Sequence, residues 1–152
     1  MSMEKSTALN ARSRKQLSPE REPRLVVPRV LIVEDDIDSA KSFEALLRQC
    51  GYDTRCANDG ANGLAAAAQF DPHFVLLDLH LPRVHGADVA RHLRVNEDGM
   101  RRVIIATTGT PRDMVSSSEF DRHLLKPIQP DELLAVLADE WSVRFVGTPW
   151  CY

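Results

Sequence analysis

The sequence predicts an α/β protein in which a parallel sheet of five strands is covered by helices on both faces. Three short runs are apolar at every position, as expected of strands buried on both sides rather than on one: 30–33, 74–77 and 103–106. Amphipathic stretches alternate with these runs, which is the pattern of repeated strand–helix–strand units. The length of 152 residues fits one domain with a core of ordinary size.

The first half of the chain predicts two strand–helix pairs. The β-branched run Val30–Val33 is the first strand. Apolar residues then recur at spacings of three and four and predict a helix that ends before Gly51: Ile37, Ala40, Phe43, Leu47 and Cys50. Residues 53–57 form a short strand. An alanine-rich helix follows over 61–70, after an Asn-Asp-Gly turn and before Asp-Pro.

The second half predicts three more strands. Residues 74–77 and 103–106 are strands, with a helix over 87–95 between them that buries Val89, Ala90 and Leu93. Residues 111–118 favour only one or two helical turns, because they contain Pro111 and a run of three serines. Residues 123–125 are the last strand. A helix over 130–141 begins with proline and two acids and buries leucines and Val136.

Composition excludes several classes of protein. With 43 % hydrophobic and 27 % charged residues, the chain is neither fibrous nor wholly disordered. No apolar run is long enough for a membrane helix, and the first nine residues do not form a signal peptide. Three scattered cysteines, without a CxxC pair, are typical of a reduced cytoplasmic protein and argue against a disulfide framework or structural zinc.

Charge divides the chain into unequal parts. Residues 1–29 hold seven basic and three acidic residues, whereas the remaining residues hold 12 basic and 19 acidic ones. We therefore expect a disordered basic leader over 1–28, an acidic domain over 29–141 and a short aromatic tail over 142–152. The composition of the leader favours a solubilising role over contact with nucleic acid or membrane. The acidic domain shows no basic patch for nucleic acid, so direct DNA binding is not expected.

Polar residues follow the predicted strands at their carboxyl ends, where sites lie in such sheets. Glu34, Asp35 and Asp36 follow the first strand, Asp78 the third, Thr108 the fourth and Lys126 the fifth. Carboxylates brought together repel one another unless a cation is present, and oxygen donors suit Mg²⁺. A lysine and a hydroxyl are groups that bind a phosphoryl group. The set indicates a metal-assisted site that accepts a phosphoryl group on a carboxylate.

Each of these residues also has an ordinary structural interpretation. Asp36 and Asp38 precede a predicted helix and are suited to cap it. Thr108 lies in a Thr-Thr-Gly turn, and Lys126 alone could be a solvated surface group. The five histidines lack the i, i+4 spacing and acid partner of zinc hydrolases, so we interpret them as non-ligands. Only the combination, each member at the end of an apolar run, favours the functional interpretation.

At these residues the sequence resembles the receiver domain of two-component response regulators. The matching strings are VLIVEDD at 30–36, LLDLHLP with a later glycine at 76–86, IIATTG at 104–109 and HLLKP at 123–127. The resemblance covers residues 29 to about 140. It implies a flavodoxin-like sheet with strand order 2-1-3-4-5, a short fourth helix, and phosphoryl transfer from a phosphohistidine with Mg²⁺.

The resemblance also implies a role for each matching residue. Asp78 corresponds to the phosphoacceptor, Asp35 to the main metal-binding acid, and Glu34 to a second acid that binds through water. Asp36 corresponds to a less certain third acid. The backbone carbonyl of His80 would bind the metal, and its side chain would face the phosphoryl group. The remaining roles are a switch hydroxyl, a phosphate-binding lysine and a cis peptide after it: Thr108, Lys126 and Pro127.

Two features depart from the family. His123 stands where a switch aromatic is common, so it is either a titratable switch or a half-buried histidine without such a role. The stretch from Thr108 to Lys126 is short by about one helical turn. Because that face usually carries the output signal, we expect an unusual output surface.

Three functions remain open. The first is a single-domain response regulator, a monomer or phosphorylation-dependent dimer. A sensor histidine kinase or histidine phosphotransfer protein would phosphorylate it, and it would signal to an unknown output protein without acting as an enzyme on other substrates. The second is a receiver cut from a hybrid kinase or larger regulator. The third, a small-molecule aspartyl-phosphate phosphatase, is disfavoured because position 80 is histidine rather than a second aspartate.

The aromatic tail has two interpretations. Trp141, Phe145, Trp150 and Tyr152 are four of the nine aromatic residues. Such residues either pack back on the domain, which we favour, or contact a partner. About a dozen residues follow the last predicted helix, too few for a DNA-binding module.

Overall fold

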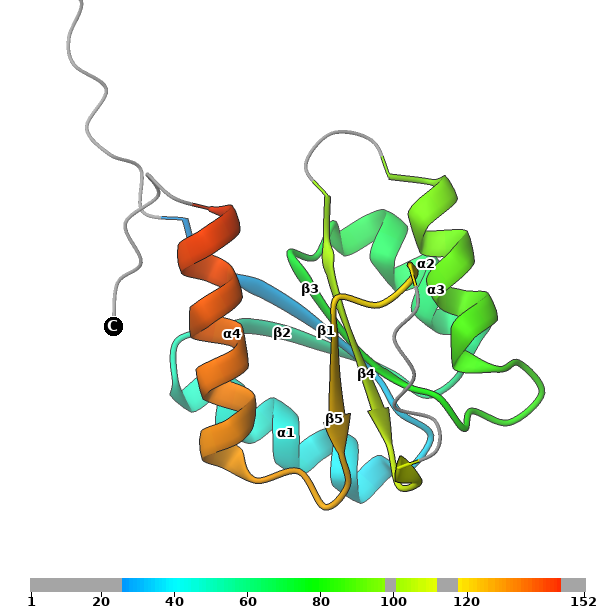
Figure 1. Cartoon of the computed structure of the whole chain (residues 1–152), viewed down its shortest axis with the longest axis horizontal. Helices are drawn as coiled ribbons and strands as arrows, with labels where there is room; N and C mark the ends of the chain where they lie inside the picture. Colours follow the sequence, from blue (N-terminus) through cyan, green and yellow to red (C-terminus); the bar gives the residue numbers. More distant parts are fainter. Residues whose placement is uncertain (1–25, 98–100, 112–117, 146–152) are drawn as a thin grey trace, which may run out of the picture.

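The computed structural model describes residues 26–97, 101–111 and 118–145 of the chain. Its centre is one sheet of five parallel strands in the order β2-β1-β3-β4-β5, with their carboxyl ends at one edge (Figure 1). The strands are β1 (Arg29–Val33), β2 (Asp53–Ala57), β3 (Phe74–Asp78), β4 (Val103–Thr108) and β5 (Arg122–Leu125). The predicted fold class and strand order are confirmed.

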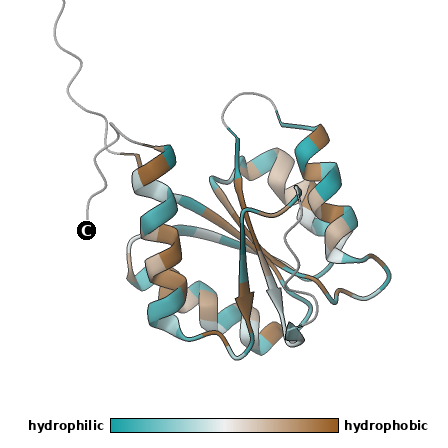
Figure 2. Cartoon of the chain, viewed as in Figure 1, coloured by the Kyte–Doolittle hydropathy of each residue, from teal (hydrophilic) through white to brown (hydrophobic). Residues whose placement is uncertain are grey.

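Four helices among the described residues cover the two faces of the sheet. They are α1 (Ile37–Gln49), α2 (Gly60–Phe70), α3 (Gly86–Val95) and α4 (Pro130–Arg144). One hydrophobic cluster joins α1 and α4 to alternate residues of the strands, and a second joins α2 and α3 to the residues between them. Along β1, Val30 and Ile32 face the first cluster, and Leu31 and Val33 the second. Figure 2 shows hydrophobic residues along the central strands of the sheet and both hydrophobic and hydrophilic residues along the helices.

The predicted elements hold, with corrections at their ends. Strands β1, β3, β4 and β5 and helices α2 and α3 extend beyond the predicted bounds by one residue, or by two at the end of β4. Helix α4 continues three residues past 141. Ile37, predicted for the buried stripe of α1, is 59 % exposed. At 3.6 residues per turn, it lies roughly 70° from the centre of the stripe that Ala40 and Leu47 form.

The aromatic end of α4 packs back on the domain. Trp141 and Phe145 are buried and stack on each other with ring centroids 4.6 Å apart. They close the first cluster, against which Val26 also packs. The predicted leader up to residue 25, residues 112–117 of the short helical segment predicted over 111–118, and Trp150 and Tyr152 lie outside the described residues.

Within residues 26–97, 101–111 and 118–145, no helix has the length and apolar character needed to cross a bilayer.

Candidate functional site

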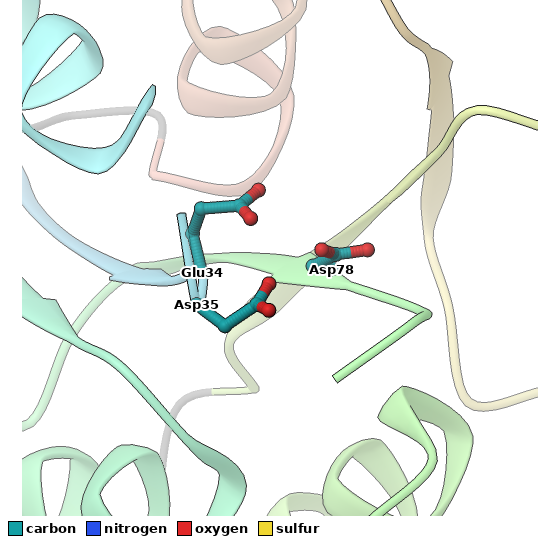
Figure 3. A group of neighbouring side chains, drawn as sticks. All are labelled: Glu34, Asp35 and Asp78. Carbon is teal, nitrogen blue, oxygen red and sulfur yellow. The ribbon is translucent and has the colours of Figure 1, made fainter. Parts of the chain in front are cut away.

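Three carboxylates meet at the carboxyl edge of the sheet. Val33 pairs with Leu77 in the parallel register, so the residues that follow on β1 lie beside Asp78 at the end of β3. One oxygen each from Glu34, Asp35 and Asp78 lies within 4.8 Å of the others. Figure 3 shows the three carboxyl groups directed toward one another from two strand ends. This is the convergence that the strand-end residues predicted.

Burial makes two of these acids depend on a cation. Glu34 is 5 % exposed and Asp78 4 %, whereas Asp35 is exposed. Burial raises the pKa of the Glu34 carboxyl, and hydrogen bonds from Lys126 and from the Asp36 amide oppose that rise. An ionised pair this far from water is stable only with compensating positive charge.

Lys126 supplies that charge from the end of β5. Its Nζ donates to Oε2 of Glu34 at 2.8 Å and to Oδ2 of Asp78 at 3.1 Å. Burial alone would lower the pKa of Lys126, but the Glu34 hydrogen bond and the charges of Asp78 and Glu34 outweigh it and raise the pKa. The peptide bond between Lys126 and Pro127 is cis, as the family resemblance implied.

The turn after β3 holds the second oxygen of Asp78. The His80 amide donates to Oδ1 at 2.9 Å, so both carboxylate oxygens accept a hydrogen bond. The side chain of His80 is exposed, and its ring centroid lies 6.2 Å from that of His85. The metal-binding role of the His80 carbonyl stays a prediction.

Thr108 and His123 lie on the two strands beyond Asp78. Thr108 is fully buried, and its hydroxyl accepts from the Thr110 amide at 3.1 Å. His123 is half-buried on β5, opposite Ala106 rather than Thr108. Its Nε2 has no hydrogen-bond partner among the described residues, its ring packs against Phe120 at 5.4 Å, and burial lowers its pKa. Their predicted switch roles remain predictions.

Asp36 lies outside the acidic group and caps α1. Its side chain accepts from the Asp38 amide at 3.2 Å and from the Ser39 hydroxyl at 2.8 Å. The Ser39 hydrogen bond is the main reason that the pKa of Asp36 is lowered. Of the two interpretations of this residue, the structure therefore supports the helix cap.

The site offers hard oxygen donors to a metal ion. The group of Glu34, Asp35 and Asp78 offers three carboxylates and, within the described part of the chain, includes no histidine. Such donors fit Mg²⁺, which takes one or two protein carboxylates and keeps several waters. The residues present therefore fit the cation that the resemblance implies.

Two contacts near the site are not predicted by the sequence. The family resemblance includes the glycine at position 86 only as part of a string, yet that glycine packs against the backbone of Asp78 and Leu79. His85 caps α3, because its Nδ1 accepts from the Ala87 amide at 3.2 Å. Spacing from Asp78 is the one cue to Gly86, and histidine is not among the usual helix caps.

Comparison with known proteins agrees with the geometry. The family model for the response regulator receiver domain matches residues 30–138. A DNA-binding response regulator, MtrA of Mycolicibacterium paratuberculosis, is 38 % identical over 109 residues, which are 70 % of this chain and 48 % of that protein. RpaA of Synechocystis, a DNA-binding dual master transcriptional regulator, is 35 % identical over 113 residues, 72 % of this chain and 47 % of its own length. The chain spans about half the length of these relatives.

Solved structures show the same fold. A CheY-like receiver domain from Methylobacillus flagellatus aligns with a TM-score of 0.69 at 28 % identity, over 75 % of this chain and 98 % of its own. The receiver domain of the sensor histidine kinase PA1611 from Pseudomonas aeruginosa has magnesium coordinated in its active-site cleft. It aligns with a TM-score of 0.67 at 29 % identity, over 75 % of this chain and 97 % of its own. The chain belongs to the response regulator receiver domain family.

Proposed function

We propose that this receiver domain accepts a phosphoryl group on Asp78 from a phosphohistidine, with Mg²⁺, and signals through contacts with another protein. The donor would be a sensor histidine kinase or a histidine phosphotransfer protein. The observation that carries the proposal is the position of the Asp78 carboxylate. It is buried, bonded to Lys126, and within 4.8 Å of two further carboxylates.

The reaction would be a direct displacement at phosphorus. A carboxylate oxygen of Asp78 attacks, the P–N bond of the phosphohistidine breaks, and its electron pair returns to the donor imidazole. Lys126 already lies 3.1 Å from Asp78 Oδ2, where its charge would stabilise the transferred oxygens. The His80 amide holds the other oxygen and fixes the direction of the carboxylate.

Glu34, Asp35 and Asp78 would hold the cation, with the His80 carbonyl as a further ligand. The bound ion would spread the negative charge of the transferring phosphoryl group. Lys126 bonds only Glu34 and Asp78 of these three acids, and this excess of negative charge supports a site that binds an additional cation.

Output would then depend on the groups around the phosphoryl site. Thr108 lies on β4, which pairs with the strand of Asp78, and His123 lies on β5, the next strand; both are the proposed switch residues. The domain would catalyse only its own phosphorylation and dephosphorylation, without acting as an enzyme on other substrates.

Labelling with acetyl phosphate tests the proposal. We expect the wild-type chain to gain one phosphoryl group in the presence of Mg²⁺, measured by intact-mass spectrometry, and to gain none when Mg²⁺ is chelated before acetyl phosphate is added. Asp78→Asn should gain none. Equal labelling of that variant would refute the acceptor assignment, and multiple turnover of p-nitrophenyl phosphate would favour a phosphatase.

A second candidate is a receiver module within a longer protein. Two observations favour it: the chain spans about half the length of its relatives, and a similar domain belongs to a sensor histidine kinase. The mass of the native protein, measured on a blot with an antibody against this domain, distinguishes the two. A band near 17.1 kDa supports the single-domain regulator, and a much larger one supports the module.

A further inference from the structure

Helix α3 begins directly against the backbone of the phosphoacceptor. Gly86, its first residue, is buried, and its amide donates to the carbonyl oxygen of Leu79 at 3.1 Å. A methyl group on Gly86 would overlap the carbonyl oxygen of Asp78 and lie 2.8 Å from Leu79 Cα. Those atoms are backbone and cannot rotate away, so only glycine allows this close approach.

The turn after Asp78 is held on its other side by β4. The Leu79 amide donates to the Thr107 carbonyl at 3.0 Å, and Asp78 pairs with Thr107 in the sheet. The turn therefore lies between strand β4 on one side and the N-terminal end of helix α3 on the other. Because the His80 amide of this turn holds Asp78 Oδ1, a shift of the turn would move the carboxylate itself.

From this arrangement we infer that Gly86 is a positioning residue: it lets the start of α3 set the direction of the Asp78 carboxylate. The inference rests on the proposed phosphoacceptor function. A misplacement of about 1 Å can cost roughly a hundredfold in rate when a reacting group must be aligned. Gly86 would act through the backbone and would not touch the phosphoryl group.

His85 offers a second, milder way to disturb the same contact. It is exposed, and its ring Nδ1 caps α3 by accepting from the Ala87 amide. Alanine at position 85 would remove the cap and loosen the start of the helix, whereas asparagine is a good cap and would restore it. Both changes remove the imidazole, so the pair separates capping from any other role of the ring.

The test measures the phosphorylation rate, the Mg²⁺ affinity and the stability to urea of each variant. We expect Gly86→Ala to lower the phosphorylation rate at saturating acetyl phosphate by about tenfold or more and to weaken Mg²⁺ binding in isothermal titration. Gly63→Ala is the matched control, because the atoms nearest to its methyl group would belong to the Val33 side chain, at 3.0 Å, rather than to backbone. It should lose stability to urea but keep both functions within about twofold. His85→Ala should lower both the phosphorylation rate and the Mg²⁺ affinity several-fold, and His85→Asn should restore both.

Each outcome bears on the inference. A folded Gly86→Ala with wild-type rate and Mg²⁺ affinity, or equal losses in Gly63→Ala, would overturn it. If Gly86→Ala does not fold, the His85 pair decides: the inference fails when His85→Ala behaves as wild type or His85→Asn does not recover. If wild-type protein accepts no phosphoryl group, the proposed function fails, and Mg²⁺ affinity alone still tests the position of Asp78.

Discussion

Lys126 Nζ lies 2.8 Å from Glu34 Oε2, which joins the end of β5 to the end of β1 across 92 residues of sequence. The same ammonium group also bonds Asp78. One ammonium group thus pairs with two buried acids on adjacent strands. The site is held together by this shared charge as much as by the sheet beneath it.

Removal of Lys126 should destabilise the domain. Without divalent cations at pH 7, we expect Lys126→Met to lower the free energy of unfolding by about 1–3 kcal/mol, because two buried carboxylates lose their partner. The loss should shrink as the pH falls, because burial raises the pKa of Glu34 and that carboxyl then takes up a proton more readily. Urea denaturation at pH 7 and at a series of lower pH values measures the loss.

The control for this variant is another lysine. Lys41 is exposed on α1, so Lys41→Met should change stability by less than about 0.5 kcal/mol. Equal effects of the two substitutions would mean that Lys126 contributes no more than a surface charge.

Asp35 and Asp36 should differ sharply in metal binding. Asp35 belongs to the acidic group, whereas Asp36 caps α1. We expect Asp35→Asn to weaken Mg²⁺ binding by about tenfold or more, which corresponds to roughly 1.4 kcal/mol. Asp36→Asn should stay within about threefold and keep its stability, because asparagine caps equally well. Isothermal titration of both variants provides the comparison, and comparable losses would return Asp36 to the metal site.

Much of the fold could be read from local pattern. The apolar runs located β1, β3 and β4, because strands buried on both faces have no polar side. Strand order came from the family resemblance rather than from the residues. Ile37 was misplaced, because a spacing of three residues permits but does not require a shared face.

Only part of the candidate site could be predicted from the sequence. Parallel strands place their carboxyl ends together, which brought Glu34, Asp35 and Asp78 into one prediction. The ion pair between Glu34 and Lys126 depends on side-chain conformations at positions 92 apart, which no local pattern encodes. The contact of Gly86 with Asp78 likewise depends on how closely α3 approaches the sheet.

A buried carboxylate at the opposite end of the sheet should matter for stability. The Asp121 side chain is 6 % exposed and accepts from the Ile104 amide at 2.8 Å and from Arg144 at 2.9 Å. Burial would raise its pKa, but the Ile104 and Arg94 hydrogen bonds outweigh that and lower it. We expect Asp121→Asn to cost about 2–4 kcal/mol in urea denaturation, because its arginines lose a charged partner.

Asp139 is the surface counterpart of Asp121. It pairs with Arg122, but its side chain is 58 % exposed. Asp139→Asn should therefore cost less than about 1 kcal/mol. Similar losses for the two variants would show that burial adds nothing to the Asp121 network.

His73 should make stability depend on pH between about 4 and 6.5. Its Nδ1 accepts from the Arg29 amide at 3.0 Å, and its ring meets Trp141 and Phe145 edge-on at 5.1 and 5.2 Å. Burial lowers the pKa of His73 from 6.5 to about 4. The unfolded chain therefore binds a proton in this window that the folded chain does not, so stability is full above pH 6.5 and falls as pH decreases.

His73→Asn isolates this effect, because its side-chain oxygen can replace Nδ1 as an acceptor but cannot titrate. We expect the variant to be less stable at pH 7, since it loses the ring contacts with Trp141 and Phe145. Its free energy of unfolding should nevertheless decline less steeply than that of the wild type between pH 6.5 and 4.5. Urea denaturation across that range measures both slopes. Parallel slopes would show that the proton taken up on unfolding belongs to other groups, because position 73 of the variant has no titratable ring.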